Sequence, residues 1–458
     1  MSGGAVMHVT QAINAMGGVL RSAISTDCEI TDFVIDSRKV SAGSCFVAFR
    51  GEVTDGNLYA QQAVDSGAAL VILEDEETFN KMSGNRVLVK SSLDALKTIG
   101  TYNLSKFKGI KVAVTGSVGK TTTKELISCV LGAKKKVYTA YGNYNNELGV
   151  AICAANMKNR SGFAVFEMGT NNTGEISALS RYIKPDVAVV TLIGHAHIGR
   201  FGNIEGLAAE KLSIVDGMTG EGTLWVHDSC RRFIGERELS KVNVRYFGTD
   251  MASHVIMGDM NRTVNGDFYF TAVMRNTPYC FKLNHIYSHF VQNSLAAIGI
   301  GMTCGLSYTD VMKGIRNFQP ENGRGRITDY GAYRVIDDTY NAGFESVMSA
   351  MNNLAEIPAS PKTAVLGEMG EIEGYEEMLY HKLMKRAKEL KDVNFIFVGK
   401  SFLKFECAEN VKVIAEKEDA MKQVAALNGG MFLFKASRAR RFEDFINYLQ
   451  KEKEQRAV

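Results

Sequence analysis

The stretch Val112-Ala-Val-Thr-Gly-Ser-Val-Gly-Lys-Thr-Thr-Thr-Lys-Glu125 decides the fold of this chain. The apolar run 111–114 predicts a buried strand, residues 116–119 predict a tight glycine loop, and Lys120-Thr121 predicts the start of a helix. Glycines let backbone N–H groups surround an anion, and the helix N-terminus adds a positive dipole. In such a loop the lysine reaches the β- and γ-phosphates and the threonine hydroxyl holds Mg²⁺. The stretch predicts a nucleoside triphosphate site made by Gly116, Ser117, Gly119, Lys120, Thr121 and Thr122.

The match to the general pattern G-x-x-x-x-G-K-[ST] is incomplete, because its first glycine would fall at Val114. A chance glycine turn before a helix is the alternative interpretation. The strand, the loop, the Lys-Thr pair and the helix occur in the required order, which favours the phosphate site.

The composition is typical of a soluble globular protein, with 458 residues, 45% hydrophobic and 22% charged. This length suits about three domains of roughly 150 residues each. A net charge of +3 gives no argument for a nucleic-acid partner. The eight cysteines form no C-x-x-C pair, which argues against zinc and disulfides and fits a reducing cytoplasm. Neither a secretory signal nor an apolar run of about 18 residues is present, so we expect no membrane insertion.

The hydrophobic pattern divides the chain into three α/β segments. Residues 1–107 alternate strand-like and helical runs and predict a small α/β domain. Residues 108–320 begin with the glycine loop and predict a mostly parallel sheet with helices on both faces. Within them, short strands between 240 and 285 predict an antiparallel edge or insertion. After a Gly- and Arg-rich linker at 319–326, the βα pattern resumes and predicts a third, Rossmann-like domain over 321–458.

Two predicted strand ends in the central domain carry candidate metal ligands, since ligands bind beyond the carboxyl ends of such strands. Strand 162–166 delivers Glu167, which either faces Mg²⁺ beside the phosphate loop or is a surface turn carboxylate. Strand 187–193 delivers His195 and His197, which suit a transition metal, a phosphate contact or a Mg²⁺ ligand.

Lys211 lies on the apolar face of a predicted helix over 203–217. A buried ammonium is costly unless it is paired, neutral or modified. Two interpretations stay open. Lys211 snorkels or pairs with a buried carboxylate, or a lowered pKa makes it reactive, so that it takes up CO₂ as a carbamate suited to Mg²⁺.

Two further segments have polar residues suited to ligand binding. The run Gly142-Asn-Tyr-Asn-Asn-Glu-Leu-Gly149 suits a substrate loop, although a plain turn has the same composition. Asp337 and Asp338 follow a predicted strand over 333–336. Three roles remain open for these two aspartates: to orient an amine, to contact a ribose, or to cap the next helix.

Taken in order, these motifs resemble the Mur ligases, and within that family the MurF-type enzymes. They are T-G-S-V-G-K-T-T-T-K-E, G-N-Y-N-N-E-L-G-V, E-M-G, G-H-A-H-I-G-R-F-G, A-A-E-K and D-D-T-Y-N-A. The resemblance covers nearly the whole chain. It implies a cytoplasmic, ADP-forming ligase of peptidoglycan precursor synthesis, which joins UDP-N-acetylmuramoyl-tripeptide to D-alanyl-D-alanine through an acyl phosphate. The three domains would bind the UDP-sugar peptide, ATP and the incoming amine, in a monomer without nucleic-acid or membrane partners.

The resemblance also implies residue roles. Lys120 would contact the ATP phosphates, Thr121 and Glu167 would hold one Mg²⁺, and His197 with a carbamylated Lys211 would hold a second. Asn293 would approach the adenine, and Arg326 and Asp338 would approach ATP from the linker and the third domain. The catalytic set would be Lys120, Lys211, His197 and Asp338. Substrate contacts would come from Ser37, Arg38, Asn145, Asn146, Tyr340 and Asn341.

Gly343-Phe344 stands where the family usually has Asn-Pro, near the expected place of the amine, so the identity of the amine is open. Two alternatives to the MurF-type reaction remain. One is another Mur-like ATP-dependent amide ligase with a different amine or acceptor, such as a folate polyglutamate or cyanophycin-type enzyme. The other is a non-catalytic, Mur-ligase-like binding subunit.

Overall fold

The computed structural model describes residues 6–51, 54–158, 160–194, 201–234, 241–263, 266–370, 372 and 374–456. The chain forms two compact units. The first contains Met1–Ile256 and Asn293–Gly314, and the second contains Met257–Gln292 and Ile315–Val458.

The first unit begins with a small α/β domain. Its five-stranded sheet has the order β2-β7-β6-β5-β4, in which β4 to β7 are parallel and β2 is antiparallel to β7. The strands are β2 (Val19–Ala23), β4 (Asp32–Val34), β5 (Ser44–Val47), β6 (Leu70–Leu73) and β7 (Arg86–Val89). A separate pair joins β1 (Met7–His8) and β3 (Glu29–Ile30), and the helices are α1 (Val9–Ala15), α2 (Ala60–Asp65), α3 (Glu76–Lys81) and α4 (Ser92–Lys106). Strands β5 and β6 are buried along their whole length because parallel strands are covered on both faces.

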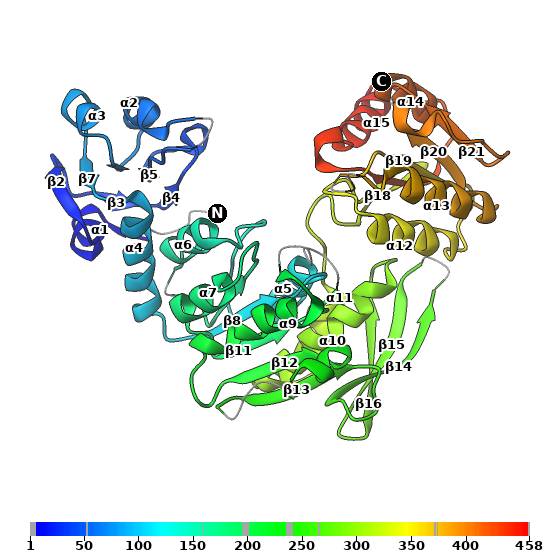
Figure 1. The fold of residues 1–458 in the computed structure, drawn as a ribbon, viewed down its shortest axis with the longest axis horizontal. Helices are drawn as coiled ribbons and strands as arrows, with labels where there is room; N and C mark the ends of the chain where they lie inside the picture. The colour runs from blue at the N-terminus through cyan, green and yellow to red at the C-terminus, as the bar shows by residue number, and fades with distance from the viewer. Residues whose placement is uncertain are drawn as a thin grey trace. The chain divides into compact units, whose positions relative to one another are not determined.

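Helix α4 attaches this small domain to the rest of the first unit (Figure 1). It packs on α6, and Ala151, Ile152 and Ala155 of α6 belong to the same apolar cluster as the first sheet. Asn103 Nδ2 donates a hydrogen bond to the carbonyl of Ala155 at 2.6 Å. Helix α6 therefore contributes to the apolar cores of both the first sheet and the central sheet.

The central sheet contains the glycine loop. Within the first unit its order is β14-β13-β12-β11-β8-β10-β9, and all these strands are parallel. The strands are β8 (Ile110–Thr115), β9 (Val137–Thr139), β10 (Phe163–Glu167), β11 (Val187–Val190), β12 (Thr223–His227), β13 (Asn243–Gly248) and β14 (Val255–Arg262). The helices are α5 (Lys120–Gly132), α6 (Glu147–Ala155), α7 (Glu175–Ile183), α9 (Ile204–Leu212), α10 (Ser288–Thr303) and α11 (Tyr308–Arg316).

The antiparallel edge predicted between 240 and 285 is only partly correct. β13 runs parallel to β12, and the antiparallel pair is β15 (Phe268–Met274) with β16 (Thr277–Leu283). The direction of a strand depends on the connection that leads into it, and the residues of β13 carry no signal of that connection.

The second unit contains a six-stranded sheet of order β17-β18-β22-β19-β20-β21. β17 is antiparallel to β18, and the other neighbours are parallel. The strands are β17 (Arg326–Tyr330), β18 (Tyr333–Asp337), β19 (Lys362–Gly367), β20 (Asn394–Val398), β21 (Val411–Ile414) and β22 (Gly430–Lys435). The helices are α12 (Phe344–Ala355), α13 (Glu376–Glu389), α14 (Lys417–Ala425) and α15 (Glu443–Arg456).

These sheets confirm the predicted α/β class, with a mostly parallel central sheet and a Rossmann-like C-terminal sheet. The domain boundaries near 107 and 320 remain predictions. Among the described helices, none is long and apolar enough to cross a membrane.

Candidate active site

The glycine loop connects β8 to α5 in a shape that requires its glycines. Gly116 has a φ of +146° and Gly119 a φ of +85°, both in the region that side chains rarely adopt. A Cβ at Gly116 would lie 1.9 Å from Thr191 Oγ1. Thr191, just after β11, donates from this oxygen to the carbonyl of Val118 at 2.7 Å. The end of the neighbouring strand therefore fixes the loop.

Lys120 lies over this loop. Its Nζ donates to the carbonyls of Gly116 at 2.9 Å and Ser117 at 3.3 Å. Thr121, the next residue of α5, is buried, whereas Thr122 is only partly buried. Asn293 of α10 is also close, because a Cβ on Gly119 would lie 3.0 Å from Asn293 Oδ1. The loop thus places an ammonium, a hydroxyl and a side-chain amide around one helix N-terminus.

Glu167 ends β10 next to the strand that leads into the loop, opposite Val114. Its side chain is not a surface turn carboxylate, because the residue is only 2% exposed. Oε1 accepts a hydrogen bond from Asn145 Nδ2 at 2.8 Å. Oε2 is buried without a hydrogen-bond partner among the described residues, and it lies 4.0 Å from Lys124 Nζ. A buried carboxylate oxygen with free acceptor capacity suits a hard cation such as Mg²⁺.

Lys211 is buried in α9, with 2% of its surface exposed. Burial, reinforced by the charge on Lys120, lowers the pKa of Lys211 to about 7, while Glu210 and Glu175 oppose the shift. An amine with this pKa is partly neutral near pH 7, which suits reaction with CO₂.

Glu210 holds α9 in place, a role that the sequence analysis did not predict. Its buried carboxylate accepts hydrogen bonds from the backbone N–H groups of Gly174 at 2.6 Å and Ile176 at 2.9 Å, at the start of α7. A carboxylate at a helix N-terminus is favoured by the helix dipole. The contact spans more than thirty residues of sequence, so no local pattern reveals it.

His197 and its neighbour His195 lie outside the described residues, and the role predicted for His197 remains a prediction. Within the described part of the chain, no group of three or more His, Cys, Asp or Glu side chains could hold a metal. The metal ligands predicted inside that part are Thr121, Glu167 and Lys211, of which only Glu167 belongs to those residue types.

The predicted substrate residues of the first unit are held by local contacts. Asn145 braces Glu167, as described above, and Asn146 Oδ1 caps α6 by accepting from the Gly149 N–H at 2.8 Å. In the first domain, Arg38 forms two hydrogen bonds of 2.9 Å with the Asp36 carboxylate and is otherwise exposed. Ser37 is the adjacent residue in the same short 3₁₀ turn, Ser37–Lys39.

Asp338 lies in a largely buried polar cluster at the carboxyl end of β18 in the second unit. Its Oδ2 accepts from Lys435 Nζ at 2.8 Å and from the Tyr287 hydroxyl at 3.3 Å. Burial raises the pKa of Asp338, although the Lys435 charge opposes the shift. Asp337 behaves differently, because its side chain accepts from the N–H groups of Gly323 and Thr339. Asp337 therefore orders the backbone, and Asp338 is the carboxylate suited to chemistry.

Three other predicted residues belong to the second unit. The ring of Tyr340 lies 3.9 Å from the guanidinium carbon of Arg324, and the carbonyl of Asn341 accepts from Lys435 Nζ at 2.9 Å. Arg326 is exposed at the start of β17 and donates to Asn322 Oδ1 at 2.6 Å. Their approach to ATP or the amine remains a prediction.

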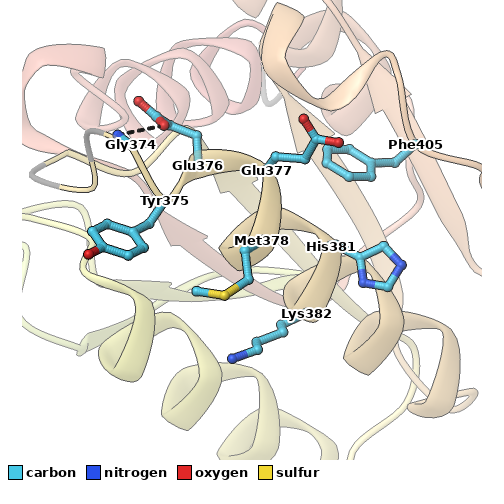
Figure 2. Close-up of a pocket in the computed structure, with 8 residues that line it drawn as sticks. All are labelled: Gly374, Tyr375, Glu376, Glu377, Met378, His381, Lys382 and Phe405. Carbon is cyan, nitrogen blue, oxygen red and sulfur yellow. Dashed lines mark hydrogen bonds between the residues drawn. The ribbon is translucent and has the colours of Figure 1, made fainter.

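A cavity of about 720 Å³ lies around the start of α13 in the second unit. Figure 2 shows the side chains that line it. His381 and Lys382 line it together with Tyr375, Met378 and Phe405. Within this cavity Glu376 accepts from the Gly374 N–H at 2.9 Å, which orders the turn before the helix. None of the residues predicted to bind ATP, metal or substrate lines the cavity, so we assign it no role.

Comparison with protein families finds two matches. Residues 114–301 match the model described as the Mur ligase middle domain. Residues 29–100 match the model described as the Mur ligase family, catalytic domain. The glycine loop, Glu167, Lys211 and Asn293 all lie within the first match.

Individual relatives are similar over nearly the whole chain. The UDP-N-acetylmuramoyl-tripeptide–D-alanyl-D-alanine ligase of Bacillus subtilis (strain 168) is 31% identical over 432 residues, covering 90% of this chain and 92% of that protein. The ligase of the same name from Rickettsia prowazekii is 28% identical, covering 93% and 97%.

Solved structures of MurF enzymes are similar to this chain over nearly its whole length. One crystal structure of MurF from Acinetobacter baumannii has a TM-score of 0.84 at 26% identity and covers 97% of this chain and 99% of that chain. MurF from Thermotoga maritima in complex with ADP has a TM-score of 0.77 at 27% identity, covering 93% and 98%.

Proposed function

The chain belongs to the Mur ligase family, and on that premise we propose that it joins UDP-N-acetylmuramoyl-tripeptide to D-alanyl-D-alanine with ATP. It is an ATP-dependent amide ligase, since its relatives over nearly the whole chain are ligases of that name. The single observation that carries the proposal is the position of Lys120 over the glycine loop, with the buried Glu167 at the end of the strand beside the one that leads into the loop.

The reaction must make a carboxylate, which is a poor electrophile, accept an amine. Transfer of the γ-phosphoryl group of ATP to the tripeptide carboxylate gives an acyl phosphate and ADP. The amine then attacks the acyl carbon, and inorganic phosphate leaves. Charge spreads over the phosphoryl oxygens during the transfer, and Lys120 at the helix N-terminus would stabilise that charge. No protein nucleophile is needed.

The residues of the site fit Mg²⁺. Oε2 of Glu167, which accepts no hydrogen bond from the described residues, and the buried Thr121 hydroxyl would hold one ion beside the loop. His197 and Lys211, carbamylated on its partly neutral amine, would serve a second ion. When bound, Mg²⁺ supplies positive charge at the phosphoryl oxygens. Asn145 keeps Glu167 oriented through its 2.8 Å hydrogen bond.

The remaining roles divide between the units. Ser37 and Arg38 would bind the UDP-sugar, and Asn145 with Asn146 would border the peptide. In the second unit, Asp338 on Lys435 would orient the amine, with Tyr340 and Asn341 beside it and Arg326 toward ATP. All eight cysteines are free thiols, which supports a cytoplasmic location. We expect the enzyme to act as a monomer.

A phosphate-release assay with UDP-N-acetylmuramoyl-tripeptide, ATP, Mg²⁺ and a panel of D,D-dipeptides tests the proposal. We expect release with D-alanyl-D-alanine and none from a Lys120→Ala variant. Release with a different amine or acceptor would support another Mur-like ligase. ATP binding without release for any acceptor would support a non-catalytic binding subunit.

A further inference from the structure

A cavity of about 380 Å³ lies in the first unit between α4, α6 and α7. It is separate from the glycine loop, and the roles proposed above leave most of it unused. Its polar lining consists of Lys97, Asn146, Glu147, Asn171, Glu175 and Tyr182. Leu93, Leu148 and Leu179 supply an apolar wall. The cavity thus has an apolar side, suited to a hydrocarbon stem, and charged groups that could bind the end of that stem.

The cavity begins beside the metal-binding carboxylate. Gly169 lines it, and the Gly169 N–H donates to the carbonyl of Asn145 at 2.8 Å, the residue whose side chain braces Glu167. Gly169 is two residues beyond Glu167, and two extended residues span at most about 7 Å. A group bound at Glu167 can therefore extend a side chain of four or five bonds, about 6 Å, into the cavity.

The proposed function fixes what that group is. The carboxylate activated by ATP is the C-terminal carboxylate of a tripeptide, so it belongs to the third residue. With this carboxylate beside Glu167 and Lys120, the third side chain is the part of the substrate within reach of the cavity.

The charges of the cavity show which side chain fits. Lys97 Nζ lies 2.6 Å from Glu147 Oε1, with 34% and 58% of the side chains exposed. Such an exposed pair contributes little to stability and exchanges partners readily. Glu175, in contrast, already accepts from the N–H groups of Asn171 and Asn172 and from the Thr170 hydroxyl. The cavity therefore offers a ligand one ammonium and one carboxylate, on neighbouring helices.

We propose that this cavity binds the side chain of the third peptide residue and selects one with a zwitterionic end. An ammonium and a carboxylate on one carbon, as in 2,6-diaminopimelate, pair with Glu147 and Lys97 at the same time. A lysine side chain ends in an ammonium alone, which pairs with Glu147 but faces the like charge of Lys97. This inference rests on the proposed function and adds the identity of the acceptor peptide to it.

The test compares kcat/KM for two UDP-N-acetylmuramoyl-tripeptides, with meso-diaminopimelate or L-lysine as third residue. The wild type should favour diaminopimelate by about tenfold or more, the size expected for a charge-assisted contact. Lys97→Met should lower kcat/KM for the diaminopimelate substrate by about tenfold, mainly through KM. It should not lower kcat/KM for the lysine substrate, because the variant also removes the like charge that this side chain faces. Glu147→Gln should weaken both substrates.

Lys106→Met is the matched control, because Lys106 is on the same helix α4, packs on Tyr102 and does not line the cavity. It should change neither substrate. Equal kcat/KM for both substrates in the wild type would overturn the inference, as would an equal loss for both in Lys97→Met. If Lys97→Met does not fold, the wild-type preference and Glu147→Gln decide. Phosphate release with both tripeptides at one rate refutes only the cavity's role, whereas no release with either refutes the proposed function.

Discussion

Replacing Lys211 with methionine should stabilise the protein at neutral and lower pH. Methionine keeps an unbranched side chain of similar length in the buried site on α9 but carries no charge. The ordinary pKa of a lysine is 10.5, and burial together with the charge on Lys120 lowers it here to about 7. The folded state therefore pays for holding the protonated amine, and the variant removes that penalty.

The pH dependence has a definite sign. Between pH 7 and 10.5 the unfolded chain keeps the proton on Lys211 while the folded chain has lost it. The unfolded state binds more protons, so the free energy of unfolding of the wild type rises with pH, by up to about 1.4 kcal/mol per pH unit. Over this window the rise totals on the order of 5 kcal/mol. The advantage of Lys211→Met should be largest below pH 7 and should shrink toward pH 10.5.

Urea unfolding followed by circular dichroism, in CO₂-free buffers from about pH 6 to 10, measures the difference in unfolding free energy between Lys211→Met and the wild type. Lys313→Met on α11 is the control, because Lys313 is exposed, and it should show no such trend. Bicarbonate should stabilise the wild type and not Lys211→Met, since a carbamate forms only on a neutral amine. A difference that does not change with pH, or a variant less stable than the wild type at pH 6, would refute the reasoning.

Three further predictions concern the phosphate loop and the buried acids. Gly116→Ala puts a Cβ 1.9 Å from Thr191 Oγ1 and should lower the affinity for ATP, measured by calorimetry, about tenfold or more. Adding Thr191→Ala should recover part of this loss. An unchanged affinity for ATP in Gly116→Ala would contradict the packing of Gly116 against Thr191. Glu167→Gln keeps the acceptor for Asn145 but loses the negative charge. The rate of phosphate release should therefore fall about 100-fold or more, with thermal stability nearly unchanged. A near-normal rate of phosphate release would disprove this role of Glu167. Lys435→Met removes the cation beside Asp338, so the pKa of that carboxyl rises further and the acidic limb of the kcat/KM profile should move to higher pH; an unmoved limb would show that Asp338 does not titrate in the reaction.

Most strands could be predicted from the sequence because buried parallel strands are continuous apolar runs. The predicted strands at 162–166, 187–193 and 333–336 correspond to β10, β11 and β18. The helix predicted over 203–217 is α9 followed by a 3₁₀ turn, Ser213–Gly217. These elements depend on local pattern, which the sequence displays directly.

The site could be predicted only where a motif is continuous. The loop from Gly116 to Thr121 is one such motif, and the burial of Lys211 followed from helical periodicity. Three contacts of the site join residues that are 34 to 73 positions apart: the support of Thr191 for the loop, the cap of Glu210 on α7, and the contact of Tyr287 with Asp338. Such contacts depend on how sheets and helices pack, and a single sequence does not contain that information.

The residue at which the loop departs from the general phosphate-binding pattern has a structural explanation. Val114 stands where the first glycine would fall, yet it lies inside β8, fully buried and opposite Glu167 of β10. Its carbonyl accepts from the Met168 N–H at 2.8 Å, so the ladder between the two strands continues through this position. The tight turn starts only at Gly116, where φ is +146°. A glycine at Val114 would weaken the strand that aligns Glu167 with the loop, whereas a β-branched side chain strengthens it. Val114→Gly should therefore impair the alignment of Glu167, the carboxylate proposed to bind Mg²⁺, more than it helps the loop. The measurable result is a lower affinity for Mg²⁺ in the presence of ATP.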